Sequence, residues 1–424
     1  MNFILRHINL LSSYIATGFS AFSSICIMYA LNYYSSIAFY GELMFYLSIS
    51  TILFSFFSFG TRETVTKIMK NHNNDISVLL SGFILDLLSS FIVIFLIYFF
   101  GEKILIYFEK FNTDLLYISK LIAIYTVFFI CQSSFTGFLK YHNKLLLINI
   151  ASITQNIVNV LIIGFYIINE SATQTSIILA YVISALCGLL VLIFGVLLFL
   201  NFKIERFSLE IFLSSFRKLY QLSKLYFMAS TAKIGVKNFE NVLIMKFLGS
   251  EAVGIYQSFL KLLSPINLLT APLGSNYQRK MIDFYIDNKY KKLKDLVFRI
   301  TKNLLFINLV YILIVMFFVD FYFETQKIQK IEYSTLLFLL LGILSLLQTS
   351  IWWSGNFMLC HFPKMPIYTN LITSILNIVV PYYSLYYYGY NGIIIFIIAS
   401  LASQAPAYFV PFFVFRKYYK NFNG

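Results

Sequence analysis

Charged side chains are scarce in this chain. They make up 12% of its 424 residues, whereas 59% are hydrophobic and 19% aromatic; a typical globular protein has roughly 25% charged residues. No stretch between the apolar segments is long enough to fold into a separate soluble domain. The composition therefore excludes a nucleic-acid-binding domain and a soluble enzyme with a membrane tether, and we expect no nucleic-acid partner.

Cysteine and histidine are also rare, and neither forms a pattern. The four cysteines are isolated, with no Cys-x-x-Cys or Cys/His spacing, which excludes a disulfide scaffold and a zinc-type site. The four histidines are scattered, and the sequence has no carboxylate cluster of metal-ligand spacing and no glycine-rich phosphate loop. We expect no catalytic residues, no metal, no cofactor and no direct use of a nucleotide, so the chain is not expected to be an enzyme.

Long apolar stretches are what the sequence has instead. A helix of about 20 residues crosses the ~30 Å hydrocarbon core of a bilayer, and twelve stretches reach or approach this length. They cover residues 8–33, 42–60, 76–100, 115–139, 145–168, 174–200, 223–248, 252–275, 296–319, 334–359, 367–387 and 392–415. The sequence therefore predicts an all-α polytopic membrane protein with twelve transmembrane helices.

The basic residues predict which side of the membrane each loop faces. If the N-terminus is cytoplasmic, the inside loops hold 23 lysines and arginines and the outside loops only four. Cytoplasmic loops are enriched in Lys and Arg. We therefore expect both termini in the cytoplasm.

Two motifs recur at a spacing close to half the chain. Gly41, near the start of the second stretch, matches Gly254, near the start of the eighth, at a shift of 213 positions. The fifth and eleventh stretches hold asparagine pairs that match at a shift of 221, Asn149 and Asn156 with Asn370 and Asn377. We expect two pseudo-symmetric six-helix bundles, residues 1–200 and 223–424, around a central cavity that holds the site. Residues 201–222 are predicted to be a cytoplasmic amphipathic linker.

The seventh stretch has three charged residues near its middle. Lys233, Lys237 and Glu240 are spaced i, i+4 and i+7, on one helix face. A charge at mid-bilayer costs at least ~2.5 kcal/mol, so such residues normally face a cavity or a partner. Two interpretations remain open: a Lys237–Glu240 pair that neutralises itself, or a stripe that lines a hydrated, net positive cavity.

The repeat supplies a polar counterpart for that stripe. A shift of 213 relates Lys233 and Lys237 to Ser20 and Ser24 of the first stretch. Ser20 and Ser24 are therefore predicted to line the cavity as substrate-binding residues, although small hydroxyl residues also occur where membrane helices pack closely.

Three further charges are candidates. Lys261 and Asp86 each fall about ten residues into a stretch, near the midplane, and Arg62 lies at the cytoplasmic end of the second stretch, at the predicted cavity mouth. Lys261 and Arg62 join the predicted substrate-binding set. Asp86 and Glu240 are the predicted proton or cation sites; pairing of either with a lysine is the alternative.

Three motifs resemble one known family. They are Tyr40-Gly41-Glu42; residues 240–244 leading through Phe247-Leu248-Gly249 to Val253-Gly254-Ile255-Tyr256; and residues 377–381 followed by Gly389 and Gly392. They are similar to motifs of polysaccharide transporters, including O-antigen flippases of the Wzx type, in the multidrug/oligosaccharidyl-lipid/polysaccharide exporter superfamily. The resemblance extends over nearly the whole chain.

This resemblance implies a function. It implies a multi-pass protein of the bacterial inner membrane that moves undecaprenyl-pyrophosphate-linked oligosaccharide to the periplasmic leaflet by alternating access, with coupling to H⁺, Na⁺ or the membrane potential. It also implies a glycan polymerase and a chain-length regulator as partners. The alternatives are a small-molecule or drug antiporter on the same fold and, less favoured, a membrane glycan polymerase, which would be expected to carry a substantial periplasmic domain.

Overall fold

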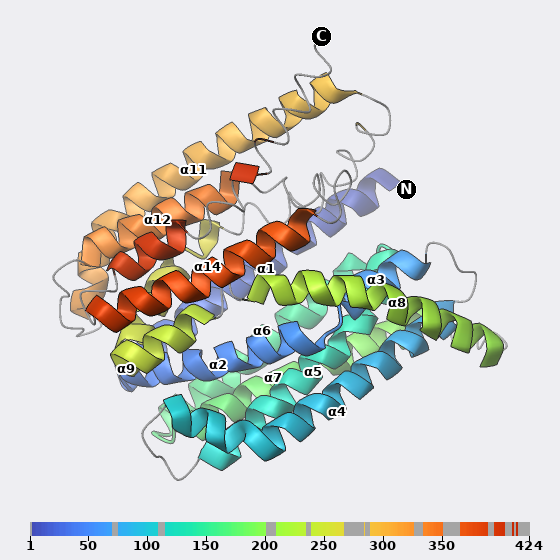
Figure 1. Cartoon of the computed structure of the whole chain (residues 1–424), viewed down its shortest axis with the longest axis horizontal. Coiled ribbons are helices and arrows are strands. Elements are labelled where there is room, and N and C mark those ends of the chain that lie inside the picture. The colour runs from blue at the N-terminus through green and yellow to red at the C-terminus, as the bar shows by residue number, and fades with distance from the viewer. Residues whose placement is uncertain are drawn as a thin grey trace. The chain divides into compact units, whose positions relative to one another are not determined.

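The computed structural model describes twelve helices and confirms the all-α class. It covers residues 2–69, 75–108, 115–200, 209–234, 239–266, 284, 289–325, 334–350, 365–388, 394–402, 409–410 and 413, and these contain no strand. The helices, labelled in Figure 1, are α1 Asn2–Tyr34, α2 Ile37–Phe57, α3 Thr61–Met69, α4 Asp75–Phe108, α5 Leu115–Tyr141, α6 Leu145–Ile168, α7 Gln174–Leu200, α8 Leu209–Ile234, α9 Phe239–Leu262, α11 Tyr290–Thr325, α12 Ser334–Ser350 and α14 Met365–Tyr388.

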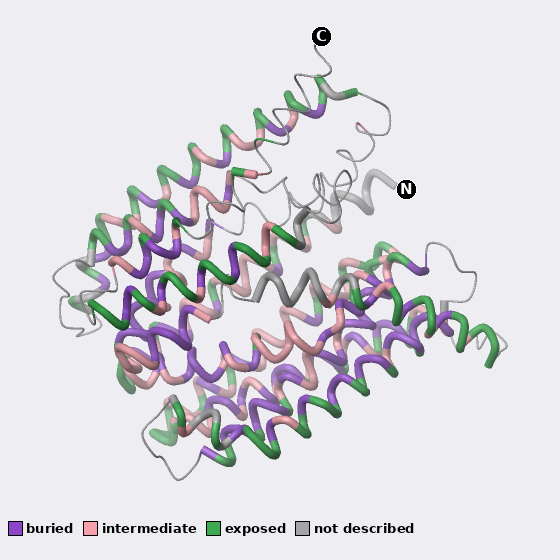
Figure 2. The backbone as a smooth tube through the Cα atoms, viewed as in Figure 1, coloured by how far each residue is buried: buried purple, intermediate pink, exposed green. Residues whose placement is uncertain are grey.

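Most of the described helices suit a membrane environment. Seven of the spans they form are long and apolar enough to cross a bilayer, and α12 contributes a shorter apolar helix. On α4, large apolar side chains such as Phe91 and Phe95 are exposed while Asp86, Ser89 and Ser90 are buried, and Figure 2 shows this division along the helix. A helix that exposes apolar groups and buries polar ones is arranged for a lipid solvent. The chain is a multi-pass membrane protein.

The predicted second span corresponds to α2. Residues 42–60 were expected to form it, and α2 covers Ile37–Phe57 before the short helix α3 begins at Thr61. Phe59 and Gly60 both have positive φ, 46° and 61°, a conformation that ends a helix. These two left-handed residues therefore separate α2 from α3, a helix that was not predicted from the sequence.

The described residues belong to two compact units. Unit 1 contains Met1–Ser35 and Phe39–Ile234, and unit 2 contains Ser36–Ala38 and Gly235–Gly424. In unit 1, α5 is central and packs against α3, α4, α6 and α7, while α1 packs on α6 and α8 packs on α3 and α4. The main apolar core of this unit draws on α3 to α8, and it includes Val65, Phe138, Leu192 and Leu219.

Unit 2 is built around the helices that follow α8. Helix α9 packs against α14 and α12, and α11 packs along α12. Phe259 of α9 and Phe338 of α12 are both fully buried and their rings meet at 5.8 Å. The polar core of this unit lies mainly on α9, α14 and residues 394–402, where Glu240, Asn377 and Ser400 are buried.

Helix α8 crosses a predicted boundary. The sequence places residues 201–222 in a linker and begins the second half at residue 223, whereas α8 is one helix from Leu209 to Ile234 and belongs to unit 1. Its residue Leu219 is buried in the unit 1 core, although Leu209 and Leu213 are exposed. The amphipathic linker and the division into domains therefore remain predictions.

The structure reproduces the internal repeat in its helix breaks. The helical geometry is interrupted at Ser36, between α1 and α2. It is interrupted again at Gly249 inside α9, where φ is 83° and ψ is −177°. These positions differ by the same 213 residues that relate Gly41 to Gly254. A Cβ at Gly254 would lie 2.1 Å from the backbone oxygen of Ile37, so only glycine fits there. The motif around Gly254 thus lies near a helix start where two backbones pack closely.

Candidate functional site

A buried carboxylate anchors the start of α3 in unit 1. Asp86 of α4 is completely buried. Its Oδ1 accepts a hydrogen bond from Thr61 Oγ1 at 2.6 Å, and its Oδ2 accepts one from the backbone N–H of Ser134 at 3.0 Å. One side chain therefore joins three helices at the position where α2 and α3 separate. This geometry gives Asp86 a positioning role, and its assignment as a proton or cation site remains a prediction.

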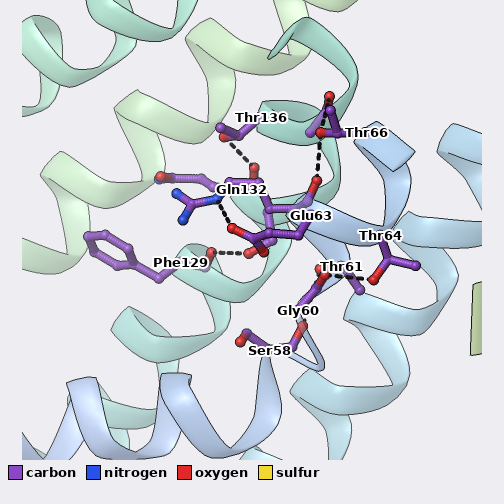
Figure 3. A network of polar contacts seen from close by, with 12 residues as sticks. Ser58, Gly60, Thr61, Glu63, Thr64, Thr66, Phe129, Gln132 and Thr136 are labelled. Atoms are coloured by element: carbon purple, nitrogen blue, oxygen red, sulfur yellow. Dashed lines mark hydrogen bonds and ion pairs between the residues drawn. The ribbon is translucent and has the colours of Figure 1, made fainter. Parts of the chain in front are cut away.

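Arg62 lies immediately beside this anchor. Its Nε is 3.0 Å from Glu63 Oε1, and the two side chains are 54% and 41% exposed, so solvent screens the pair and leaves the guanidinium accessible. Figure 3 shows this part of α3 facing Gln132 and Thr136 of α5. The backbone of α3 approaches α5 closely, because a Cβ at Gly137 would lie 2.5 Å from the Arg62 oxygen.

A second cation lies near Arg62. Lys140 follows Gly137 by one turn of α5, and its charge interacts with those of both Arg62 and Glu63. The sequence counts Lys140 only among the inside-loop charges, because nothing in its local pattern links it to Arg62. Together, Arg62, Lys140 and Glu63 have a net positive charge, which suits an anionic group such as a phosphate.

Glu240 occupies a buried polar site in unit 2. Because the chain turns at Gly249, the second part of α9 folds back along the first. Tyr256 OH donates to Glu240 Oε2, and one residue further along Gln257 Nε2 donates to Asn241 Oδ1 at 2.6 Å. The two contacts define a helical hairpin with Gly249 at its tip.

Two further residues contact this site. Ser400 Oγ lies 2.6 Å from Glu240 Oε1 and 3.0 Å from Asn377 Oδ1 of α14. The site thus combines a carboxylate, two hydroxyls and an amide oxygen, which are hard ligands for a proton or an alkali cation.

The first half of the chain has no such site at the matching positions. A shift of 213 relates Glu240 to Ile27, Asn241 to Met28, Tyr256 to Leu43 and Gln257 to Met44. All four unit 1 residues are buried. The repeat therefore preserves the helix break while the side chains inside it change from apolar to polar.

The structure places the other predicted site residues as follows. Ser20 and Ser24 are half-buried on α1, and Lys261 is half-buried on α9. The Lys233 side chain and the whole of Lys237 lie outside the described residues. The described residues therefore do not test whether Lys233 and Lys237 lie opposite Ser20 and Ser24. The roles of these residues and of Lys261 remain predictions.

Sequence reasoning missed three members of the Glu240 site. Tyr256 stood only within a family-like motif, Asn377 within another such motif and as a marker of the repeat, and Ser400 in no pattern at all. The recurrence of Asn377 was the one signal that could have pointed to it. Among the described residues, no group of three or more His, Cys, Asp or Glu could hold a metal ion.

Comparison with solved structures defines the class of protein. An inward-facing MATE family multidrug resistance transporter of the MOP superfamily has a TM-score of 0.71 and 10% identity, covering 98% of this chain and 99% of that one. The MATE multidrug transporter DinF-BH has a TM-score of 0.71 and 13% identity over 97% and 95%. A MOP superfamily transporter from Pyrococcus furiosus has a TM-score of 0.63 and 11% identity over 96% and 95%. The fold is that of a MOP transporter.

The family follows from the sequence itself. The family model described as polysaccharide biosynthesis protein matches residues 8–276, and the chain belongs to this family. No curated protein matches the chain significantly. The chain thus combines membership of the polysaccharide biosynthesis family with a fold shared with MOP transporters.

Proposed function

We propose that the chain is a flippase for undecaprenyl-pyrophosphate-linked oligosaccharide, such as an O-antigen repeat unit. The observation that carries this proposal is the family: a polysaccharide biosynthesis protein with a transporter fold has a glycan as its expected cargo. A glycan cannot cross hydrocarbon unaided, because each unsatisfied polar group costs several kcal/mol. A hydrated path for the sugar head, with the prenyl tail left in lipid, meets this requirement.

The charges of unit 1 support an anionic head group. Arg62 and Lys140 place two cations near the start of α3, and Lys233, Lys237 and Lys261 add candidates elsewhere in the chain. Pyrophosphate favours such residues. Its outward movement is also favoured by an inside-negative potential, by about 2.3 kcal/mol per charge per 100 mV if the full drop is crossed.

Glu240 is the proposed coupling site. Its carboxylate is buried with Tyr256, Asn377 and Ser400 in contact, so a transported H⁺ or Na⁺ would find oxygen ligands there. Asp86 differs in its contacts, because its hydrogen bonds join three helices. We propose a bacterial inner membrane location with both termini cytoplasmic, and a glycan polymerase and chain-length regulator as partners.

One experiment separates the main alternatives. In a strain that lacks the gene, a flippase leaves lipid-linked repeat units on the cytoplasmic leaflet, and surface glycan disappears. Restoration by the wild-type gene at normal membrane abundance is the control. Normal surface glycan together with lost drug efflux from vesicles would instead identify a drug antiporter, and single repeat units on the outer leaflet would identify a polymerase.

A further inference from the structure

Helix α11 is too long to lie wholly within a bilayer. It has 36 residues, Tyr290–Thr325, and at 1.5 Å per residue it is about 54 Å long, compared with a hydrocarbon core of ~30 Å. Part of the helix must therefore lie at the level of the lipid headgroups or beyond. Its first turns are the polar part, since residues 291–302 contain five lysines and arginines and one acidic residue, Asp295.

One face of α11 changes from basic to apolar along its axis. Lys292, Arg299, Phe306 and Leu313 recur every seven residues, or about two turns, and therefore share a side of the helix. All four are exposed, and Figure 2 shows an exposed face along the length of α11. The first two are cationic and the next two are apolar, with Phe306 68% exposed.

Lys302 widens the basic part of this face. It lies one turn after Arg299 and one turn before Phe306, and it is exposed. The opposite side of the helix packs inward through Leu293, Val297 and Leu304, which are buried. Within the described residues, the one ion pair joins Arg62 to Glu63, so no described carboxylate is paired with Arg299 or Lys302.

We propose that this face of α11 binds an anionic phospholipid of the cytoplasmic leaflet. Arg299 and Lys302 hold the headgroup phosphate, and the acyl chains lie along Phe306 and Leu313. The occupant follows from the order of the residues: an acidic peptide would match the cations but not the exposed apolar row that continues from them at hydrocarbon depth. Each basic residue near the membrane surface raises the affinity for anionic lipid by about fivefold. This inference does not depend on the transported substrate.

Lipid binding to the purified full-length protein tests the proposal. The delipidated protein in detergent is titrated with phosphatidylglycerol or phosphatidylcholine, and bound lipids are counted by native mass spectrometry. The Arg299→Gln/Lys302→Gln variant should bind phosphatidylglycerol at least about tenfold more weakly, with phosphatidylcholine unchanged. The matched control is Lys103→Gln/Lys120→Gln, which removes two exposed cations from α4 and α5 and should bind as the wild type does.

Two other probes complete the test. Glycerol phosphate, which has the headgroup without chains, should bind far more weakly than phosphatidylglycerol, and equal binding would contradict the role of Phe306 and Leu313. Undecaprenyl pyrophosphate should not displace phosphatidylglycerol at equal concentration. Equal phosphatidylglycerol binding by the two double variants would overturn the proposal. Binding of undecaprenyl pyrophosphate without any binding of phosphatidylglycerol would also overturn it.

Discussion

Asn241 and Gln257 are 16 residues apart in the chain, yet the side-chain amide of Gln257 donates to Asn241 Oδ1 at 2.6 Å. The adjacent pair, Glu240 and Tyr256, has the same separation. Both contacts exist because α9 folds back on itself at Gly249, so the polar site in unit 2 depends on one residue at the tip of a hairpin.

Replacement of Gly249 by alanine should therefore destabilise the protein. Its φ of 83° lies in a region that L side chains rarely adopt, and such strain costs on the order of 1–3 kcal/mol. The thermal unfolding midpoint of the purified protein should fall. Gly164→Ala is the control, because its site in α6 has open space and an ordinary helical φ; an equal fall in both variants would refute the strain argument.

The Glu240→Gln variant should uncouple transport from the ion gradient. The change keeps the size of the side chain but removes the charge that would attract H⁺ or Na⁺. In proteoliposomes, export should lose its stimulation by an imposed proton or sodium gradient, while Tyr256→Phe should retain part of it. Glu251→Gln changes an exposed carboxylate on the same helix and should behave as the wild type does. Gradient stimulation that survives in Glu240→Gln would exclude this residue as the coupling site.

For Asp86, the expected effect is on stability. Asp86→Ala removes the carboxylate that accepts from the Thr61 hydroxyl and the Ser134 N–H. The Thr61 hydroxyl keeps a longer contact to Ser58 O at 3.2 Å, and loss of the buried hydrogen bonds should cost about 1–3 kcal/mol. Thermal unfolding of Asp86→Ala, Thr61→Val and the double variant should show coupling between the two positions. Ser89→Ala, whose hydroxyl bonds only within α4, should be nearly silent. A stable Asp86→Asn variant that has lost ion dependence would favour the coupling role instead.

The lysine stripe gives a separate prediction. If Lys237 attracts substrate, Lys237→Gln should impair export and Lys237→Arg should retain much of it, whereas Lys237→Gln/Glu240→Gln should not rescue. If the two residues only neutralise each other, the double change should restore export, since each single change strands a charge. Membrane abundance must match the wild type, with Lys103→Gln as the control. Normal export from an abundant Lys233→Gln/Lys237→Gln variant would remove the cationic-cavity hypothesis.

The sequence predicts helices well where polar residues bound an apolar stretch. Helices α6 and α7 have the expected limits, residues 145–168 and 174–200, because hydropathy alone determines them. The predicted span that ends at residue 60 stops just before Thr61. Hydropathy does not show, however, that Phe59 has a positive φ or that a separate helix α3 follows, because these features depend on packing.

The candidate sites were predictable only in part. Asp86 and Glu240 could be identified because charged residues deep in a span need a partner or a cavity. Their partners could not, because Thr61, Tyr256 and Ser400 reach them through the break before α3, the hairpin at Gly249 and the packing of distant helices. A hydroxyl in a membrane helix has no sequence pattern that distinguishes a ligand from a packing residue.

The difference between the two repeats has a thermodynamic consequence. A ligand shifts a conformational equilibrium only by the difference in its affinity for the two states. Ile27 and Leu43 stand in the first half where the second has Glu240 and Tyr256. An ion that binds the proposed site at Glu240 would therefore act on unit 2 alone at these matching positions, and it would favour whichever conformation binds it more tightly.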